Sequence, residues 1–207
     1  MSPRAPAMSA DQRRAALVDA TLPLLRERGP AVSTREIAAA AGIAEGTIFR
    51  VFDSKDELVQ ACIHHAFDSD RLLAALHDVD RALPLQPRLT AAVELLQAHL
   101  RGVFSLMITL RSGPPSAVHR PSSEAEVAEH ADRRRRDTAR IDAEMTELVG
   151  ADAETLRVPV QRLLDFVRML TLSSVHPFMQ HSSASAAEIV DVALFGLSAA
   201  GPMTRGN

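Results

Sequence analysis

The sequence contains neither tryptophan nor tyrosine and has one cysteine, Cys62. Without Trp or Tyr, a binding pocket must do without indole and phenol hydrogen-bond donors. One cysteine cannot form a disulfide within the chain, which is typical of proteins in a reducing compartment. No apolar run approaches the roughly 18 residues of a membrane-spanning helix, and the first ten residues lack the apolar core of a signal peptide. We therefore expect a cytoplasmic protein that does not associate with a membrane.

A strong excess of charge is also absent, because the formal net charge is only −3 at pH 7. The charge is uneven along the chain. Residues 1–55 carry eight basic and six acidic side chains, which gives +2, so the remainder carries −5. The first segment is therefore the better candidate to bind a polyanion.

The alternation of apolar and polar residues that is typical of β-strands is missing. Apolar residues recur instead at spacings of three and four, and Gly and Pro separate the segments, so we predict an all-α fold. Pro23 lies inside the first expected helix, where we expect a kink. The expected helices span residues 11–28, 33–41, 45–52, 54–75, 89–110, 124–149, 153–173 and 186–200.

The segment "STREIAAAAGIAEGTIFRVFDSKDEL", residues 33–58, contains signals for two short helices in close succession. Ser33 and Glu36 have the spacing of a capping box, and Gly42 ends the first helix. Two short helices joined by a Gly-containing turn are typical of a helix-turn-helix, whose second helix fits a DNA major groove. The same pattern also occurs in helical bundles that never contact DNA. Taken alone, it favours neither structure.

This segment resembles the DNA-binding signature of the TetR family of bacterial transcriptional regulators, and the match extends from the helix with Arg13 and Arg14 through Leu58. It covers roughly the first quarter of the chain. The resemblance implies an N-terminal helix-turn-helix DNA-binding bundle followed by a larger helical ligand-binding and dimerisation bundle. We predict a flexible arm over residues 1–10, a DNA-binding domain over 11–55 and a ligand-binding and dimerisation domain over 56–207.

The resemblance also implies which residues contact double-stranded DNA. Thr34 and Lys55 match positions that hold phosphates, and Gly46 and Thr47 match the front of the recognition helix. Arg50 points outward and could reach a guanine or a phosphate. The complete predicted set is Thr34, Glu45, Gly46, Thr47, Phe49, Arg50 and Lys55.

Three positions depart from the family pattern. Phe49 stands where the family usually has Tyr, so a hydrogen bond from a phenol to phosphate is lost. Ala44 and Glu45 stand where Ser and a basic residue are frequent, which weakens the electrostatic attraction to DNA. Glu45 could complement the helix dipole or accept a hydrogen bond from a cytosine amino group, and we favour the dipole role.

The last two expected helices are apolar around much of their circumference, and the family resemblance favours a twofold homodimer that binds a palindromic operator. Burial within one protomer is the alternative explanation for this apolar surface. The predicted interface residues are Val160, Leu163, Leu164, Val167, Ile189, Ala193, Gly196 and Leu197.

A cavity for a small apolar effector is expected among the helices that follow the DNA-binding domain. Met and Phe at helical spacing are more often core residues than pocket residues, so this prediction competes with simple burial. The predicted pocket residues are His99, Phe104, Met107, Ile108, Phe166, Met169, Leu170, His176 and Phe178.

Motifs for catalysis or metal binding are not visible. We find no nucleophile elbow, phosphate-binding Gly loop or paired-carboxylate motif, and Cys62 and His65 lack further ligands at a metal-site spacing. We expect no cofactor, no metal and no enzyme activity. The four consecutive arginines at 133–136 are better explained by ion pairs on a solvated helix than by a second nucleic-acid patch. The sequence thus predicts a ligand-responsive transcriptional repressor; the alternative is a TetR-like protein that binds protein or ligand without DNA.

Overall fold

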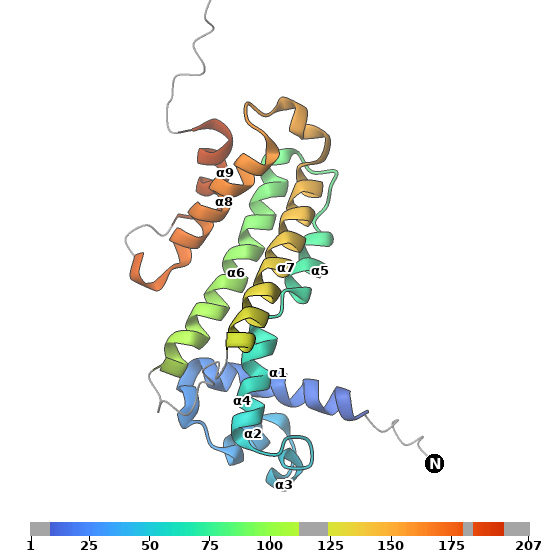
Figure 1. The fold of residues 1–207 in the computed structure, drawn as a ribbon, viewed down its shortest axis with the longest axis vertical. Coiled ribbons are helices and arrows are strands. Elements are labelled where there is room, and N and C mark those ends of the chain that lie inside the picture. Colours follow the sequence, from blue (N-terminus) through green and yellow to red (C-terminus); the bar gives the residue numbers. More distant parts are fainter. Residues whose placement is uncertain (1–8, 112–123, 180–183, 197–207) are drawn as a thin grey trace, which may run out of the picture. The chain divides into compact units, whose positions relative to one another are not determined.

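The computed structural model of the chain describes residues 9–111, 124–179 and 184–196. These residues form α-helices and short 3-10 helices, with no strand among them, which confirms the predicted all-α fold (Figure 1). The predicted arm falls largely on residues 1–8, outside this part of the chain. The elements are α1 (Ala10–Arg28), η1 (Gly29–Ala31), α2 (Thr34–Ala41), α3 (Glu45–Ile48), α4 (Lys55–Phe67), α5 (Asp70–His77), α6 (Leu85–Arg111), α7 (Glu124–Val149), η3 (Gly150–Thr155), α8 (Val160–Val175), η4 (Pro177–Met179) and α9 (Ala186–Phe195).

The helices group into two compact units. The first holds α1 to α4 together with residues 102–111 of α6, and the second holds α5, residues 85–101 of α6, and α7 to α9. The predicted functional domains divide the chain at residue 55 instead, because the DNA-binding signature ends near the start of α4. Those domains remain a prediction about function, whereas the two units describe how the chain packs.

Local start and stop signals define the helices of the first unit. Ser33 and Glu36 form the predicted capping box at the start of α2, and Gly42 ends this helix in the left-handed conformation at φ 66°. Ser54 caps α4 by accepting a hydrogen bond from the Glu57 backbone N–H. The two signals predicted for α2 are confirmed, because each depends only on residues within one helical turn.

The core of the first unit contains apolar residues of the helix-turn-helix segment. Ile37, Ile48 and Phe52 are fully buried, and Ile43 is half-buried against the same cluster. α1 packs against α2 and α4, and α2 packs against α3. α1 is continuous from Ala10 to Arg28 through Pro23, and the kink expected there remains a prediction.

Several helix boundaries differ from the sequence prediction, including the start of α6 at Leu85 rather than residue 89 and the end of α9 at Phe195 rather than residue 200. α3 ends at Ile48 rather than near residue 52, because the N–H groups of Arg50 and Val51 bond carbonyls three residues back, in a tighter turn. The expected helix over 54–75 is two helices, α4 and α5, separated at Asp68 and Ser69. α8 begins at Val160 rather than near residue 153, because Pro159 occupies the N-cap position.

The second unit is a helical bundle in which α7 packs against α5 and α8, and α8 packs against α9. Arg88 is 7% exposed and donates hydrogen bonds to the carbonyl of Arg81 and to the Asp152 carboxylate. Gln97 of α6 donates to the Ser174 hydroxyl at 2.8 Å and to the Ala184 carbonyl at 2.9 Å. The Gln97 contacts fix α6 against the end of α8 and the chain that leads into α9, and the Arg88 contacts fix α6 against η3 and the segment that precedes α6.

α6 is, among the described helices, the one that is long and apolar enough to cross a membrane by length and composition. Its buried residues show a different use of this apolar surface. Leu89 and Val93 lie in the core of the second unit, and Leu106 and Leu110 lie in the core of the first. This burial is typical of a helix that supports a protein core.

Candidate functional site

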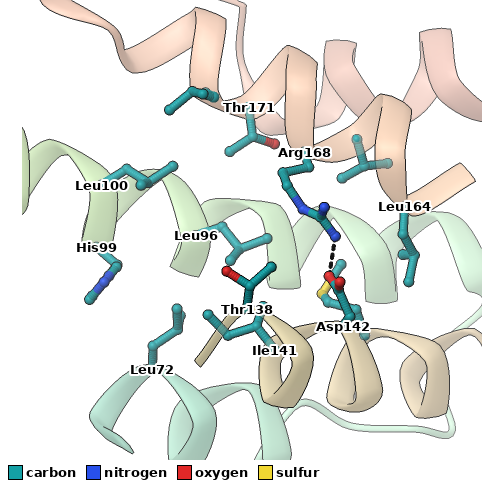
Figure 2. A pocket seen from close by; sticks show the side chains of 13 residues that line it. Leu72, Leu96, His99, Leu100, Thr138, Ile141, Asp142, Leu164, Arg168 and Thr171 are labelled. Atoms are coloured by element: carbon teal, nitrogen blue, oxygen red, sulfur yellow. Dashed lines mark hydrogen bonds and ion pairs between the residues drawn. The ribbon is translucent and has the colours of Figure 1, made fainter. Parts of the chain in front are cut away.

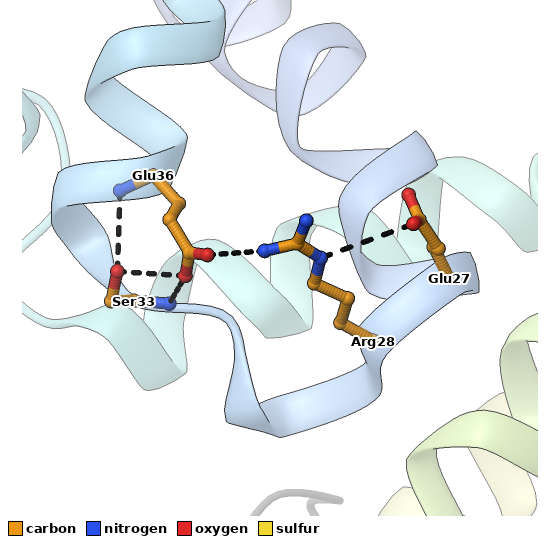
Figure 3. A network of polar contacts seen from close by, with 4 residues as sticks. All are labelled: Glu27, Arg28, Ser33 and Glu36. Atoms are coloured by element: carbon orange, nitrogen blue, oxygen red, sulfur yellow. Dashed lines mark hydrogen bonds and ion pairs between the residues drawn. The ribbon is translucent and has the colours of Figure 1, made fainter.

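The first unit holds the start of α2 with a network of polar contacts (Figure 3). The Glu36 carboxylate accepts hydrogen bonds from the Ser33 backbone N–H and hydroxyl, each at 2.8 Å, and a further one from the Arg28 guanidinium. The hydrogen bonds from Ser33, followed by the charge of Arg28, lower the pKa of the Glu36 carboxyl. The ionised carboxylate therefore anchors α2 to the end of α1.

The short α3 presents one face to the core and the other to solvent. Ile48 is buried, whereas Glu45 and Gly46 are exposed, as are Phe49 and Arg50 in the turn after the helix. A Cβ at Gly46 would meet no atom within 4 Å, so packing within the chain does not require a glycine there. This open backbone position leaves room for close approach of another molecule.

Two predicted DNA-contacting residues bond each other. The Thr34 hydroxyl donates to the Glu45 carboxylate, which connects the first turns of α2 and α3. Glu45 also lies in the first turn of α3, where a negative charge complements the helix dipole. The position of Glu45 thus suits the dipole role that we favoured, although its role at DNA remains a prediction.

Lys55 is fixed at the start of α4 by a hydrogen bond from its Nζ to the Pro30 carbonyl, at 2.6 Å. An ammonium group has three N–H donors, so two remain for other acceptors. Lys55 is half-buried. The contact with Pro30 orients the ammonium without using up its capacity to bind a phosphate.

Sequence reasoning did not identify Arg14 as a positioning residue. Its guanidinium donates to the Val51 carbonyl at 3.3 Å and to the Glu57 carboxylate at 2.8 Å, and it lies 4.2 Å from the centre of the Phe52 ring. Glu57 also accepts from the Asp53 backbone N–H, and this bond, followed by Arg14, lowers the pKa of Glu57. Arg14 thus holds the turn after α3. The one sequence signal for this role of Arg14 was its place beside Arg13 in the helix where the match to the family begins.

Arg35 is a second residue that the prediction omitted. It lies in the first turn of α2 and is exposed, next to Thr34 in the sequence. A cation at the start of α2 adds to the positive charge that Arg50 and Lys55 supply in the same unit. Its neighbour Thr34 was the sequence signal that could have suggested it.

A cavity of about 250 Å³ lies within the second unit, between α5, α6, α7 and α8 (Figure 2). Of the predicted pocket residues, it includes His99 alone. Phe104, Met107 and Ile108 belong to the part of α6 that packs with the first unit. Most of the predicted pocket residues therefore do not line this cavity. Of the remaining members, Leu170 and His176 are half-buried, and Phe166, Met169 and Phe178 are exposed.

The predicted dimer residues also divide into two groups. Leu163, Leu164, Val167 and Ile189 are buried in the core of the second unit, as in the alternative explanation for the apolar helices. Val160 and Ala193 are half-buried, Gly196 is exposed at the end of α9, and Leu197 lies outside the described residues. The exposed apolar side chains on these helices are instead Phe166, Met169, Leu172 and Phe195.

The remaining candidates are accounted for by packing and ion pairs. Cys62 is fully buried, and burial, with a smaller effect of Asp19, raises the pKa of its thiol to about 12, as for an unreactive core cysteine. On α7, Arg133 and Arg135 form ion pairs with Glu129 and Asp132. Across the described ranges, no three His, Cys, Asp or Glu side chains lie close enough together to hold a metal ion.

Comparison with known proteins supports a regulatory role. Residues 17–62 match the model of a family described as bacterial regulatory proteins, tetR family. An HTH-type transcriptional repressor of Mycobacterium tuberculosis is 38% identical over 84 residues, which cover 37% of this chain and 44% of that protein. An HTH-type transcriptional regulator of Mycobacterium bovis is similar to the same extent. The alignment thus spans less than half the length of these relatives.

The fold is similar to those of solved regulators over nearly the whole chain. A TetR transcriptional regulator from Streptomyces coelicolor superposes with a TM-score of 0.56 at 21% identity, covering 92% of this chain and 99% of that one. A TetR family transcriptional regulator from Thermus thermophilus gives a TM-score of 0.52 at 18% identity, over 88% of this chain and 98% of that one. At these identities the similarity shows the fold alone.

Proposed function

This chain belongs to the TetR family of bacterial regulatory proteins, and we propose that it is a ligand-responsive transcriptional repressor that binds a palindromic operator as a homodimer. It would act in the cytoplasm, where the operator lies. The observation that carries the DNA-binding part of the proposal is the exposed face of α3 at Gly46 together with exposed Arg50 in the turn that follows, while Ile48 lies in the core. The family match also supports the expectation that the chain is not an enzyme.

The contacts around α3 support binding to phosphates as well as bases. Arg14 and Glu57 hold the turn after α3, and the capping box holds the start of α2, so the exposed side chains lie on a fixed frame. Lys55 and Thr34 supply donors at two helix starts, and Arg50 supplies a guanidinium suited to a guanine edge or a phosphate. Specific binding to one sequence would come from α3, and general affinity from the surrounding donors.

The second unit supports the effector part of the proposal. Its cavity can hold a small molecule, and Leu96 and Leu100 on its wall belong to α6, the helix that also gives Leu106 and Leu110 to the core of the first unit. An effector changes operator affinity only if it binds one state of the protein more tightly than another. We infer that α6 carries this difference, because it takes part in both cores.

The DNA-binding proposal is tested by fluorescence anisotropy with DNA that flanks the chain's own gene, measured at several salt concentrations. Arg50→Ala and Lys55→Ala should each weaken binding. Each should also lower the magnitude of the slope of the logarithm of the binding constant against the logarithm of the salt concentration, by about one for each phosphate that the variant no longer neutralises. Arg134→Ala on α7, which removes an exposed arginine from the second unit, is the matched control and should change neither quantity. Equal affinity for the flanking DNA and random DNA would favour the alternative, a TetR-like protein that binds protein or ligand without DNA.

A further inference from the structure

The cavity of the second unit has largely aliphatic walls. Among its lining residues are Leu72 on α5, Leu96 on α6, Ile141 and Met145 on α7, and Leu164 and Val167 on α8 (Figure 2). An apolar cavity of about 150 Å³ can already hold benzene. A volume of about 250 Å³ therefore suits one substituted ring or a short chain rather than a larger molecule.

One polar atom on this wall lacks a partner. Thr171 is 1% exposed, and its Oγ1 is buried with no hydrogen-bond partner in the described part of the chain. A threonine in a helix often donates to a carbonyl one turn back, as Thr90 does to Gln86. Thr171 makes no such bond, and its side chain lies on the cavity wall. A buried hydroxyl without a partner lowers stability, so a ligand that bonds it gains affinity.

The charges of Asp142 and Arg168 on the cavity wall, and of Asp165 beside Arg168, favour a neutral ligand. Arg168 of α8 forms an ion pair with Asp142 of α7, and its second terminal nitrogen lies 3.8 Å from Asp165. Two carboxylates thus face one guanidinium, and the local charge of these three groups is negative. An anionic ligand would have to displace Asp142 from Arg168 and would still be repelled by both carboxylates.

We propose that this cavity binds a small neutral molecule with one ring and a single hydrogen-bonding group, and that Thr171 is the residue that bonds this group. The inference rests on the proposed function in that the bound molecule would be the effector. It goes further by naming the class of molecule and the residue that selects it.

The test compares p-cresol, toluene and 4-methylbenzoate by isothermal titration calorimetry with the full chain. The three probes share a methyl-substituted ring and differ in carrying a hydroxyl, no polar group or a carboxylate. We expect p-cresol to bind at least as tightly as toluene and at least about tenfold more tightly than 4-methylbenzoate. Thr171→Val should lower the affinity for p-cresol about tenfold, which is the effect of losing one buried hydrogen bond. The affinity for toluene should change by no more than about twofold.

Two further variants keep the test decisive. Thr171→Ser retains the hydroxyl and should retain the p-cresol preference. Thr90→Val removes a hydroxyl that already bonds the Gln86 carbonyl, away from the cavity, and should change neither affinity. The proposal is overturned if no probe binds, if 4-methylbenzoate binds most tightly, or if Thr171→Val leaves the ratio of p-cresol to toluene affinity unchanged.

Release of operator DNA is measured separately, so that the two proposals fail separately. If p-cresol binds through Thr171 but DNA stays bound at saturating p-cresol, the site stands and the simple effector role of such a ligand is contradicted. If the protein binds its operator but none of the three probes, the repressor proposal stands and this inference fails.

Discussion

The hydroxyl of Thr34 donates a hydrogen bond to the carboxylate of Glu45, which joins the first turn of α2 to the first turn of α3. The bond has two opposite consequences for DNA binding. It orients the recognition helix, and it also keeps a negative charge on the surface that would meet phosphates. Glu45 therefore supports the structure of the helix-turn-helix while it opposes the electrostatic part of its affinity.

Glu45→Gln separates these two effects. A glutamine can still accept a hydrogen bond from Thr34 but carries no charge. We therefore expect operator affinity to rise about fivefold, because the variant loses the repulsion between Glu45 and a phosphate, which is roughly 1 kcal/mol for two unit charges about 4 Å apart in water. Fluorescence anisotropy measures the change. Glu147→Gln removes an exposed carboxylate from α7 and should have no effect. Weaker binding by Glu45→Gln would show that the carboxylate itself contacts a base.

Gly46→Ala tests whether DNA approaches the backbone of α3 closely. A Cβ at this position meets no atom of the chain, and alanine favours helix, so the free energy of unfolding should rise by up to about 1 kcal/mol. Operator affinity should nevertheless fall about tenfold, because the methyl group occupies space that a phosphate or base edge would need. Urea denaturation and anisotropy measure the two quantities. Unchanged operator affinity would remove Gly46 from the interface.

The structure also shows which parts of this fold a sequence can predict. Ser33, Glu36 and Gly42 act within one helical turn, so their spacing predicted the start and end of α2 correctly. The break between α4 and α5 was missed although Asp68, Ser69 and Asp70 include residues that favour helix ends and starts. Apolar residues recur at helical spacing on both sides of this segment, and this periodicity outweighed the local signal.

The candidate sites were less predictable, because they depend on which side of a helix faces the core. α8 is apolar on several sides, so its sequence could not show that Val167 is buried while Phe166 and Met169 are exposed. Contacts between distant segments had no sequence signal of their own. Arg14 and Glu57, 43 positions apart, form one such contact, and Thr34 and Glu45 form another.

The stability of the protein should decrease above pH 9 because of Cys62. Burial raises the pKa of this thiol from its usual value of 9.0 to about 12. Between these values the unfolded chain loses a proton that the folded chain keeps, so the stabilisation present below pH 9 is lost as the pH rises toward 12. The chain has no tyrosine and one lysine, so few other side chains titrate in this range.

Urea denaturation at pH 8 and pH 10.5 measures this effect. Cys62→Ala lowers stability at both pH values by creating a cavity, but it should show a smaller loss between them than the wild type. The native thiol should also react with iodoacetamide only after the protein unfolds. If Cys62→Ala loses as much stability between pH 8 and pH 10.5 as the wild type does, then groups other than Cys62 cause the loss of stability at alkaline pH.

The exposed apolar side chains of α8 and α9 make the dimer prediction specific. Met169 is 59% exposed and Phe195 is 60% exposed, and their helices pack against each other. A second copy of the chain that covers them would remove this apolar surface from water. Met169→Glu would place a charge in that interface without touching the buried core, so we expect the dimer dissociation constant to rise at least about 30-fold, as for loss of a central interface residue.

Sedimentation equilibrium measures the dissociation constant, and circular dichroism should show unchanged helix content. Val127→Glu introduces the same charge at an exposed valine of α7 and should leave the dimer intact. If both variants stay dimeric, the two copies meet elsewhere. If Met169→Glu is a folded monomer that also binds a palindromic operator more weakly than Val127→Glu does, then assembly through α8 and α9 is required for operator binding, because one recognition helix cannot contact both half-sites.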